Sequence, residues 1–472
     1  MEKKKTALLS PIIRKRLKKF TTIKRGYYSF LIILAVYVLS FFSEFLINGN
    51  ALMVKYDGEL YFTAYSSVQL KKNVNEKSRK ARMDYFGAVK YSDFNESQMS
   101  ELKSKRILAE NRYNQYRVLK VISDDEFDTL YATQDGMLSR LEFAEKVNTV
   151  SQQELNKLRR TFERAEENYN TALEFRDATP EKIASLKTDY EEIKKVKEYV
   201  SKSHRRLSEL FNDSENDNWA IMAPYSYGPN ESLLDELDTN PPTPPDSKHW
   251  VGTDDRGRDV LARLVYGFRI SMSFALLVVV AGYTLGVIVG ALVGFFGGKF
   301  DFITMRFIEI WSSMPFLFTV MIIASIMVPN FLLLVIILSL WGWIGTAWYI
   351  RAEFLREKNR DYVQAAQAIG VSNTKIIFRH ILPNSLTPLI SFLPFSIISG
   401  IGSLVSLDFL GFGLPAPTPS WGELLNQGIG NINSWWIAIA PIGAMFLTLM
   451  LVTFIGEAVR EAFDPKVYSR LR

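Results

Sequence analysis

Long uncharged, apolar runs alternate with charge-rich segments along this chain of 472 residues. A helix crosses the ~30 Å hydrocarbon layer of a bilayer with about 20 apolar residues, so each run can hold a membrane span. The uncharged runs cover residues 26–43, 270–298, 310–350, 381–407 and 424–456. The third run is too long for one span, and the turn-forming pair Pro329 and Asn330 divides it. The pattern therefore predicts an all-α membrane protein with six transmembrane helices, at 27–46, 271–296, 305–327, 331–351, 384–405 and 435–456.

Basic side chains near the span ends predict the orientation. Residues 1–27 contain ten Lys and Arg residues and one acid, Glu2, which places the N-terminus in the cytoplasm. With six spans the C-terminus lies on the same side, and the short loops around Pro329 and at 408–434 contain no Lys or Arg. A cleavable signal peptide is the alternative for the N-terminus, but no small-residue cleavage site follows Phe42. We therefore expect a multi-pass protein of the bacterial inner membrane. Its expected parts are a basic cytoplasmic segment (1–26), a first span (27–46), an external region (47–270) and a transmembrane domain (271–472). The transmembrane domain includes a cytoplasmic loop at 353–383.

The remaining composition excludes several kinds of site. The net charge of +6 and the pI near 9.0 average an apolar part and a charge-rich part, so they do not indicate nucleic-acid binding. The chain has no cysteine, and its three histidines, His204, His249 and His380, lie far apart without ligand spacing. We expect no catalytic residue, no metal site and no cofactor.

Four glycines recur at four-residue spacing in the second predicted span, at positions 282, 286, 290 and 294. They make one smooth helix face that a neighbouring backbone can approach closely. The pattern fits packing within this chain or an interface with another subunit, and we favour packing within the chain.

The loop before the fifth span contains signals for two short helices. Asp361 is suited to cap the first, with Gln364 reaching back in the manner of a capping box. Gly370 can end that helix in a left-handed conformation, and Ser372 can cap a second helix that stops before Pro383. The result is a compact loop, which is either an ordinary basic loop on the cytoplasmic side or a docking element.

The spacing of the Ala pair, Gly370 and the Leu-Pro pair resembles the "EAA" coupling loop of ABC importer permeases. Two positions depart from that pattern: the usual Glu is Gln364, and the usual apolar residue two before the Leu is His380. The resemblance implies that this 361–383 loop transmits ATP hydrolysis in a partner into movement of the transmembrane helices. The residues that it assigns to the loop are Asp361, Gln364, Ala365, Ala366, Gly370, His380, Leu382 and Pro383.

A second signature precedes the second span. Asp254 or Asp255, together with Gly257, suggests a turn. An amphipathic segment follows with Arg258, Arg263 and Arg269 on its polar face, as in a helix lying on a membrane surface. The pattern closely resembles the second permease of dipeptide and oligopeptide ABC importers. Its matching positions are Gly252, Thr253, Asp254, Gly257, Arg258, Asp259, Arg263, Gly267, Arg269 and Ser271. Residues 406–415 and 421–425 look like the same family's loop before the last span. Residues 54–62 and 456–465 narrow the resemblance to the microcin-C-type oligopeptide permeases.

The resemblance implies a transport subunit that imports oligopeptides or peptide-like compounds. Its expected partners are a second homologous permease, two ABC ATPase subunits, a periplasmic peptide-binding protein and membrane lipid. In agreement, the sequence contains no Gly-x-x-x-x-Gly-Lys-Ser/Thr phosphate loop, so nucleotide is expected to bind to another chain. A secondary transporter and a membrane-anchored scaffold are the rival classes. A secondary transporter should have paired charges within the membrane, and this sequence has only Glu309 near a span end. A scaffold needs a single anchor, so it would leave six spans unexplained.

Residues 70–215 form a polar insert in the external region. Ser151 to Glu154 reads as a capping box that opens a helix to about Arg176, and Thr179 with Pro180 opens the next helix. Apolar residues at 3–4 spacing predict that these two helices form an antiparallel coiled-coil hairpin, completed to a small bundle by helices near 96–120 and after Ser123. The insert is either a solvated bundle or a docking domain. The sequence does not give the cargo, its length preference or the pore-lining residues.

Overall fold

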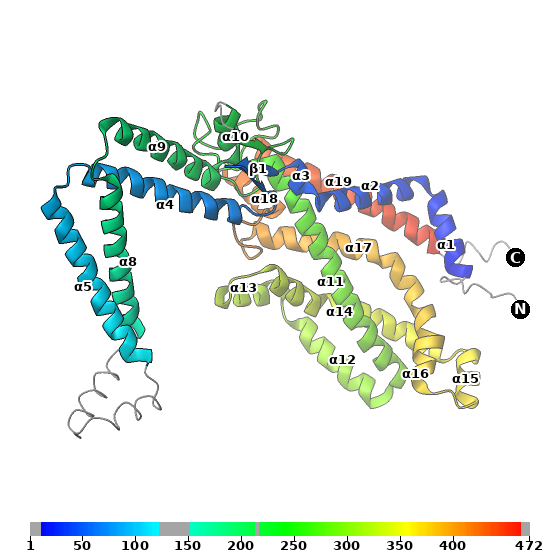
Figure 1. Ribbon diagram of the computed structural model, residues 1–472. Coiled ribbons are helices and arrows are strands. Elements are labelled where there is room, and N and C mark those ends of the chain that lie inside the picture. Colours follow the sequence, from blue (N-terminus) through cyan, green and yellow to red (C-terminus); the bar gives the residue numbers. More distant parts are fainter. Residues whose placement is uncertain (1–10, 122–151, 213–216, 464–472) are drawn as a thin grey trace, which may run out of the picture. The chain divides into compact units, whose positions relative to one another are not determined.

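The computed structural model describes residues 11–121, 152–212 and 217–463 and is mostly helical (Figure 1). The chain forms two units, one of residues 1–52 with 222–472 and one of residues 53–221. The capping residue Ser151 and the short helix predicted after Ser123 lie outside the described residues. The structure is not purely helical as predicted, because the second unit contains a small β-sheet.

Two long helices form the centre of the first unit: α11 (Val260–Phe296) and α14 (Phe331–Lys358). They pack closely along the predicted glycine face. A Cβ added at Gly286 would lie 2.6 Å from the carbonyl oxygen of Trp343, and one at Gly290 would lie 2.5 Å from that of Ala347. Any side chain there would collide with backbone, so this face serves packing within the chain, as favoured from the sequence.

Apolar side chains explain which further helices surround this pair. Helix α17 (Leu382–Phe409) packs against α11, and α19 (Trp435–Phe463) packs against α17 and against α2 (Lys24–Ser40). Helix α18 (Trp421–Gly430) packs against α17 and α19, and the short α3 (Ser43–Leu46) follows α2. Many large apolar side chains on the outside stay exposed, among them Ile322 at 61 %, Ile326 at 76 % and Phe446 at 64 %. Such a surface suits lipid or another apolar subunit better than water.

Within the described residues, four helices are long and apolar enough to cross a membrane: α11, α14, the continuous helix over residues 373–409, and α19. Two bent pairs bring the number to as many as six. Helix α12 (Gly298–Ser313) meets α13 (Phe316–Ile326) at 71°, with Pro315 at the break, and the basic α1 (Pro11–Thr22) meets α2 at 96°. The third predicted span, 305–327, is therefore broken in its middle. Proline explains the break, since it disfavours a helical conformation at the residue before it.

The start of the first span packs against the end of the last. Arg25 lies 3.0 Å from Glu457, Lys19 donates to the carbonyl oxygen of Glu461, and the Gly26 backbone lies against Ala458. Helices α1 and α2 thus begin beside the C-terminal end of α19, on the same side of the unit.

The second unit contains a three-stranded antiparallel sheet of order β2-β1-β3. Strand β1 (Met53–Tyr56) and β2 (Glu59–Phe62) form a hairpin whose turn places Asp57 and Gly58 at positive φ. Strand β3 (Trp219–Ile221) returns beside β1. The chain therefore enters and leaves this unit through neighbouring strands.

The helices of the second unit pair differently from the prediction. Helix α8 (Gln152–Phe175) packs antiparallel to α5 (Glu96–Val121), with Tyr113 stacked on Phe162 and Arg106 over Tyr169. Helix α9 (Pro180–Lys202) packs antiparallel to α4 (Val68–Tyr91), where Tyr85 stacks on Tyr190. The predicted α8–α9 hairpin is wrong, although the Thr179 cap and the Pro180 start are confirmed. Figure 1 shows α4 and α5 leading outward and α8 and α9 returning beside them.

A buried histidine makes the second unit sensitive to acid. His204 opens α10 (His204–Asn212), is 3 % exposed and contacts the carbonyl oxygen of Val200 through Nε2. Burial lowers the pKa of His204 to about 4, and the charge of Lys71 acts in the same direction. The unfolded chain accepts the proton near pH 6.5, so stability present above this pH is lost as the pH falls towards 4.

We expect the free energy of unfolding of this unit to fall by about 2 kcal/mol between neutral pH and pH 5. The full loss, reached below pH 4, is about 3 kcal/mol. The measurement is hydrogen exchange of residues 196–211 in the full chain at pH 7.5 and pH 5, corrected for intrinsic rates. His204→Gln, which cannot take up a proton, should remove the difference between the two pH values. An unchanged pH response in this variant would contradict the assignment to His204.

Candidate functional site

The 361–383 loop is built on a buried apolar base. Val363 and Ala366 of α15 (Asp361–Ala368) point inward together with Ile376, Ile377 and Ile381, which follow the short α16 (Asn373–Lys375). They pack on Phe295 of α11 and on Ile350 and Phe354 of α14. The loop is thus a compact element that is anchored to the two central helices of the first unit.

Gly370 joins the two halves of the loop at φ +80°, as predicted. Its N–H donates to the carbonyl of Gln367, and the N–H of Val371 donates to that of Ala366. These two bonds form a Schellman motif, which requires a residue in the left-handed region. A Cβ at Gly370 would meet nothing within 4 Å, so its surroundings are open.

Two predictions for helix ends in the loop are wrong. Helix α15 begins at Asp361 itself, and the residue before it, Arg360, makes no side-chain cap. Asp361 therefore cannot form the predicted capping box with Gln364. Its negative charge in the first turn instead interacts favourably with the helix dipole. The second helix does not stop before Pro383, because the π-helix η1 (Ile376–Ile381) continues directly into α17. The wider turn accommodates Pro383, which cannot donate to an earlier carbonyl.

The surface of the loop is partly apolar. Ile369 is 81 % exposed and Phe378 is 64 % exposed, and Ala365 and Ala368 are exposed beside them. Of the other predicted positions, Gln364 and Pro383 are exposed, while His380 and Leu382 are half-buried. An anchored loop with apolar side chains on its open face is suited to dock on another protein.

The signature before the second span forms a buried charged cluster, which we define as Asp254, Arg258, Arg263 and Glu423. Arg258 donates from Nε to Asp254 Oδ2 at 2.7 Å and from Nη2 to Glu423 at 3.1 Å. Arg263, with no exposed side-chain surface, pairs with Glu423 and lies 3.6 Å from Asp254. It also donates to the carbonyl oxygen of Pro229 at 3.0 Å. The predicted surface helix is wrong. Helix α11 begins at Val260, so Arg263 lies in its first turn, and Asp254 and Arg258 lie in the turn before it. Both arginines are buried and contact Glu423 of α18.

The other signature residues hold the same region together. Asp259 caps α11 through Ala262 N and accepts from the hydroxyl of Tyr225 at 2.6 Å and from Nδ1 of His249 at 2.9 Å. Burial, followed by the charge of Asp259, raises the pKa of Tyr225. Gly252 and Gly257 adopt positive φ in the turns before α11.

The four remaining positions of the signature lie in the same buried region. Thr253 bonds with Thr243, and Gly267 lies against the indole of Trp421. Arg269 binds Glu44 at 2.9 Å beside the end of α2, and Ser271 is buried in α11. The signature therefore positions the N-terminal end of α11 against α18 and the first span.

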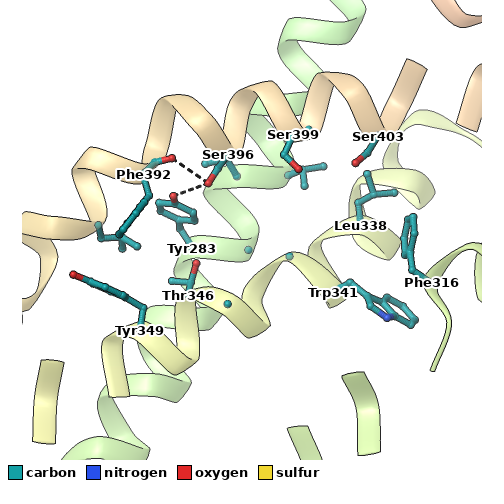
Figure 2. A pocket seen from close by; sticks show the side chains of 17 residues that line it. Tyr283, Phe316, Leu338, Trp341, Thr346, Tyr349, Phe392, Ser396, Ser399 and Ser403 are labelled. Atoms are coloured by element: carbon teal, nitrogen blue, oxygen red, sulfur yellow. Dashed lines mark hydrogen bonds between the residues drawn. The ribbon is translucent and has the colours of Figure 1, made fainter. Parts of the chain in front are cut away.

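A pocket of about 550 Å³ lies among α11, α13, α14 and α17 (Figure 2). Its polar side-chain groups are hydroxyls and the indole N–H of Trp341, and the Tyr283 hydroxyl lies 2.8 Å from that of Ser396. Ser399 and Ser403 follow along α17, and Thr346 lines the pocket from α14 (Figure 2). None of the described residues that line it is charged. Sequence reasoning did not find this pocket, because its lining comes from apolar runs in which single hydroxyls carry no distinct signal.

Comparisons with known proteins agree with these features. Residues 282–468 match the family model of the binding-protein-dependent transport system inner membrane component. Over 252 residues the chain is 48 % identical to the inner membrane ABC transporter permease protein YejE of Escherichia coli, covering 53 % of this chain and 73 % of that protein. The peptidoglycan transport system permease protein YejE of Agrobacterium fabrum is 49 % identical over 218 residues, which are 46 % of this chain and 57 % of the relative.

A more distant relative is the dipeptide transport system permease protein DppC of Bacillus subtilis. It is 34 % identical over 250 residues, which are 52 % of this chain and 78 % of the relative. Among solved structures, the inward-facing MetNI methionine ABC transporter aligns with a TM-score of 0.37 at 15 % identity, covering 43 % of this chain and 96 % of that one. A TM-score this low does not define a shared fold.

Proposed function

The chain belongs to the family of binding-protein-dependent transport system inner membrane components, and we propose that it is one permease subunit of an ABC transporter that imports oligopeptides or peptide-like compounds. The 48 % identity to a permease over 73 % of its length carries this proposal. The names of the other relatives, which include dipeptide and peptidoglycan transport permeases, support the class of cargo. Relatives of this kind are transport subunits, so the chain is not an enzyme.

The proposed assembly contains a second homologous permease, two ATPase subunits and an external peptide-binding protein. ATP hydrolysis belongs to the partner ATPases, in line with the lack of a phosphate-loop motif in this sequence. The exposed apolar side chains on the outer helices support contact with lipid and with the second permease.

The proposed topology has six spans, with each bent helix pair contributing one. Helix α1 contains Arg14, Lys15, Arg16, Lys18 and Lys19, so we assign it to the cytoplasmic surface and α2 to the membrane. Since α1 packs beside the end of α19, both termini are proposed to lie in the cytoplasm together with the 361–383 loop. The second unit, which joins the first span to α11, is then external, as a helical insert with paired coiled-coil-like arms.

We propose that the 361–383 loop docks on an ATPase through Ile369, Phe378 and the exposed alanines. Its base packs on Phe295 and Phe354, so movement of the docked loop is passed to α11 and α14. Alternating access then follows from tilting these helices against the second permease.

The pocket among α11, α14 and α17 is the proposed part of the cargo path in this subunit. Hydroxyl groups can bond to peptide amides and carbonyls whatever the side chains, and a lining without charge does not select among cargo charges. Selection would then rest with the external binding protein.

The test is affinity purification of the tagged full-length chain from native membranes in mild detergent, with partners identified by mass spectrometry. The proposal predicts co-purification of a second permease and of ATPases with phosphate loops. Recovery of the chain without any ATPase, even after cross-linking, would contradict the proposal and favour a scaffold or a secondary transporter.

A further inference from the structure

A second pocket, of about 500 Å³, lies between α2 and α19 and shares no lining residue with the pocket of Figure 2. Phe268 of α11 and Trp421 of α18 line it and are themselves buried. The indole N–H of Trp421 is already used, because it donates to the carbonyl oxygen of Leu264 at 3.0 Å. None of the described residues that line this pocket is charged, so its interior offers mostly carbon atoms to a ligand.

The pocket opens on the outer surface of the two helices. Leu39 and Leu46 line it on one side and Leu447 of α19 on the other, and all three side chains are exposed. They continue the apolar surface that suits lipid, so the medium at the opening is the hydrocarbon of the bilayer. Water does not fill an apolar cavity, and an empty one loses dispersion contacts along its lining. A flexible acyl chain from the bilayer is suited to fill this space.

One end of the pocket contains a buried hydroxyl group without a partner. Ser43, the first residue of α3, lines the pocket and is 2 % exposed, and its Oγ has no hydrogen-bond partner among the described residues. The nearby Ser40 differs, since its Oγ donates to the carbonyl oxygen of Tyr37 at 2.7 Å. A buried donor without an acceptor is unfavourable, so Ser43 indicates a ligand with an acceptor oxygen at this end.

Two ion pairs mark the boundaries of the apolar part of α2. Arg25 pairs with Glu457 at its start, and Glu44, next to Ser43, binds Arg269 at 2.9 Å beyond its end. Residues 26–43, between these pairs, are uncharged. Charged side chains favour the polar surface of a bilayer over its hydrocarbon centre. Ser43 therefore lies at the level of one bilayer surface, where the ester groups of phospholipids also lie.

We propose that this pocket binds one acyl chain of a membrane phospholipid, whose ester carbonyl accepts a hydrogen bond from Ser43. The ester lies at the boundary marked by Glu44 and Arg269, and the hydrocarbon chain runs between α2 and α19 towards Ile33 and Leu451. A single acceptor at the bilayer surface, followed by a long apolar part, is the chemistry of an ester-linked chain. The bound chain completes the packing between the first and the last span. This lipid site does not depend on the cargo or on the transport assignment.

The test uses the full-length chain in phosphatidylcholine nanodiscs that contain a small share of a photoactivatable phosphatidylcholine. This probe has a diazirine in the middle of one ester-linked acyl chain. After illumination, the cross-linked peptides are identified by mass spectrometry. We expect more labelling on the pocket segments of α2 and α19 than on α13, where Ile322 and Ile326 are exposed but do not line this pocket.

Two substitutions test the two parts of the site. Ala444→Phe places a ring in the pocket and should remove most of the excess labelling, while Ala35→Phe is its matched control, because Ala35 is exposed on α2 outside the pocket. Ser43→Ala should lower the labelling about three- to tenfold, as for the loss of one hydrogen bond. A probe with an ether-linked chain has no carbonyl, so it should label the original protein and Ser43→Ala equally. Unchanged labelling of α13 shows that each variant is folded.

Equal labelling of the pocket and α13, or labelling that Ala444→Phe leaves unchanged, would overturn the proposal, because lipid would then only surround the helices. A Ser43→Ala variant that binds the ester-linked probe as well as the original protein does would overturn the role of Ser43. The labelling is repeated in native membranes, where the partners of the chain are present. Loss of the pocket signal there would overturn the proposal as well, by showing that another subunit covers the pocket.

Discussion

Replacing Gly370 by arginine is expected to lower peptide uptake by about a hundredfold or more while the protein still inserts in the membrane. A Cβ added at Gly370 meets no atom within 4 Å in this chain, so the arginine side chain can start into open space, although φ +80° strains any residue other than glycine. In the proposed complex, however, the substitution places a long charged group on the docking face beside Ile369. An unpaired charge in an apolar interface costs several kcal/mol, and each 1.4 kcal/mol is about a tenfold loss of affinity. The measurement is uptake of labelled peptide by cells that express equal amounts of either protein.

Gly370→Asn is the matched control. Asparagine tolerates the left-handed conformation at φ +80° and adds no charge, so this variant should keep most of the uptake. If both variants were equally inactive, backbone strain and not docking would explain the loss. Normal uptake by Gly370→Arg would contradict the coupling role of the loop.

Replacing Arg263 by methionine should destabilise the first unit by about 3 kcal/mol. Methionine fills the space but leaves Glu423 and the buried Asp254 with one fewer positive partner, and breaking a buried ion pair costs about 3–5 kcal/mol. We place the loss at the lower end because Arg258 still contacts both acids. The measurement is the thermal unfolding midpoint of the protein in nanodiscs.

Arg256→Met provides the comparison. Arg256 lies 3.4 Å from the same Glu423, but its side chain is 55 % exposed. An exposed pair contributes about 0–1 kcal/mol, so this variant should unfold close to the original midpoint. Equal midpoints for Arg263→Met and Arg256→Met would show that the burial of Arg263 does not matter for stability.

Features set by local sequence were predictable in this chain. The central and last spans follow from uncharged runs, and Asn330 caps α14 at the predicted division of the longest run. Gly370 and Thr179 adopt the predicted roles because helix ends depend on a few neighbouring backbone groups. The predicted capping box at Asp361 is wrong because α15 begins one residue earlier than expected, with Arg360 at the N-cap position.

Features set by distant partners were not predictable. The apolar stripe on α8 indicates which face is buried but not which helix covers it, and α5 covers it instead of α9. Arg263 was expected on a membrane surface, because its partner Glu423 follows 160 residues later in the chain. The buried Glu357 of α14 likewise accepts from the hydroxyl of Tyr362, which in turn accepts from Asn384, and both partners follow the end of that helix in the sequence.

The most direct test of the coupling claim is a cross-link from the 361–383 loop to its partner. Ala368 is exposed on α15, so Ala368→Cys supplies a single thiol in a chain that otherwise has none, and Thr21→Cys on α1 is the control. A thiol-specific photo-cross-linker is attached in native membranes, and the products are identified by mass spectrometry. The account predicts a product between Ala368→Cys and a subunit with a phosphate loop, in greater yield than from Thr21→Cys. Products with lipid or unrelated proteins alone, from membranes in which the ATPases are present, would contradict it.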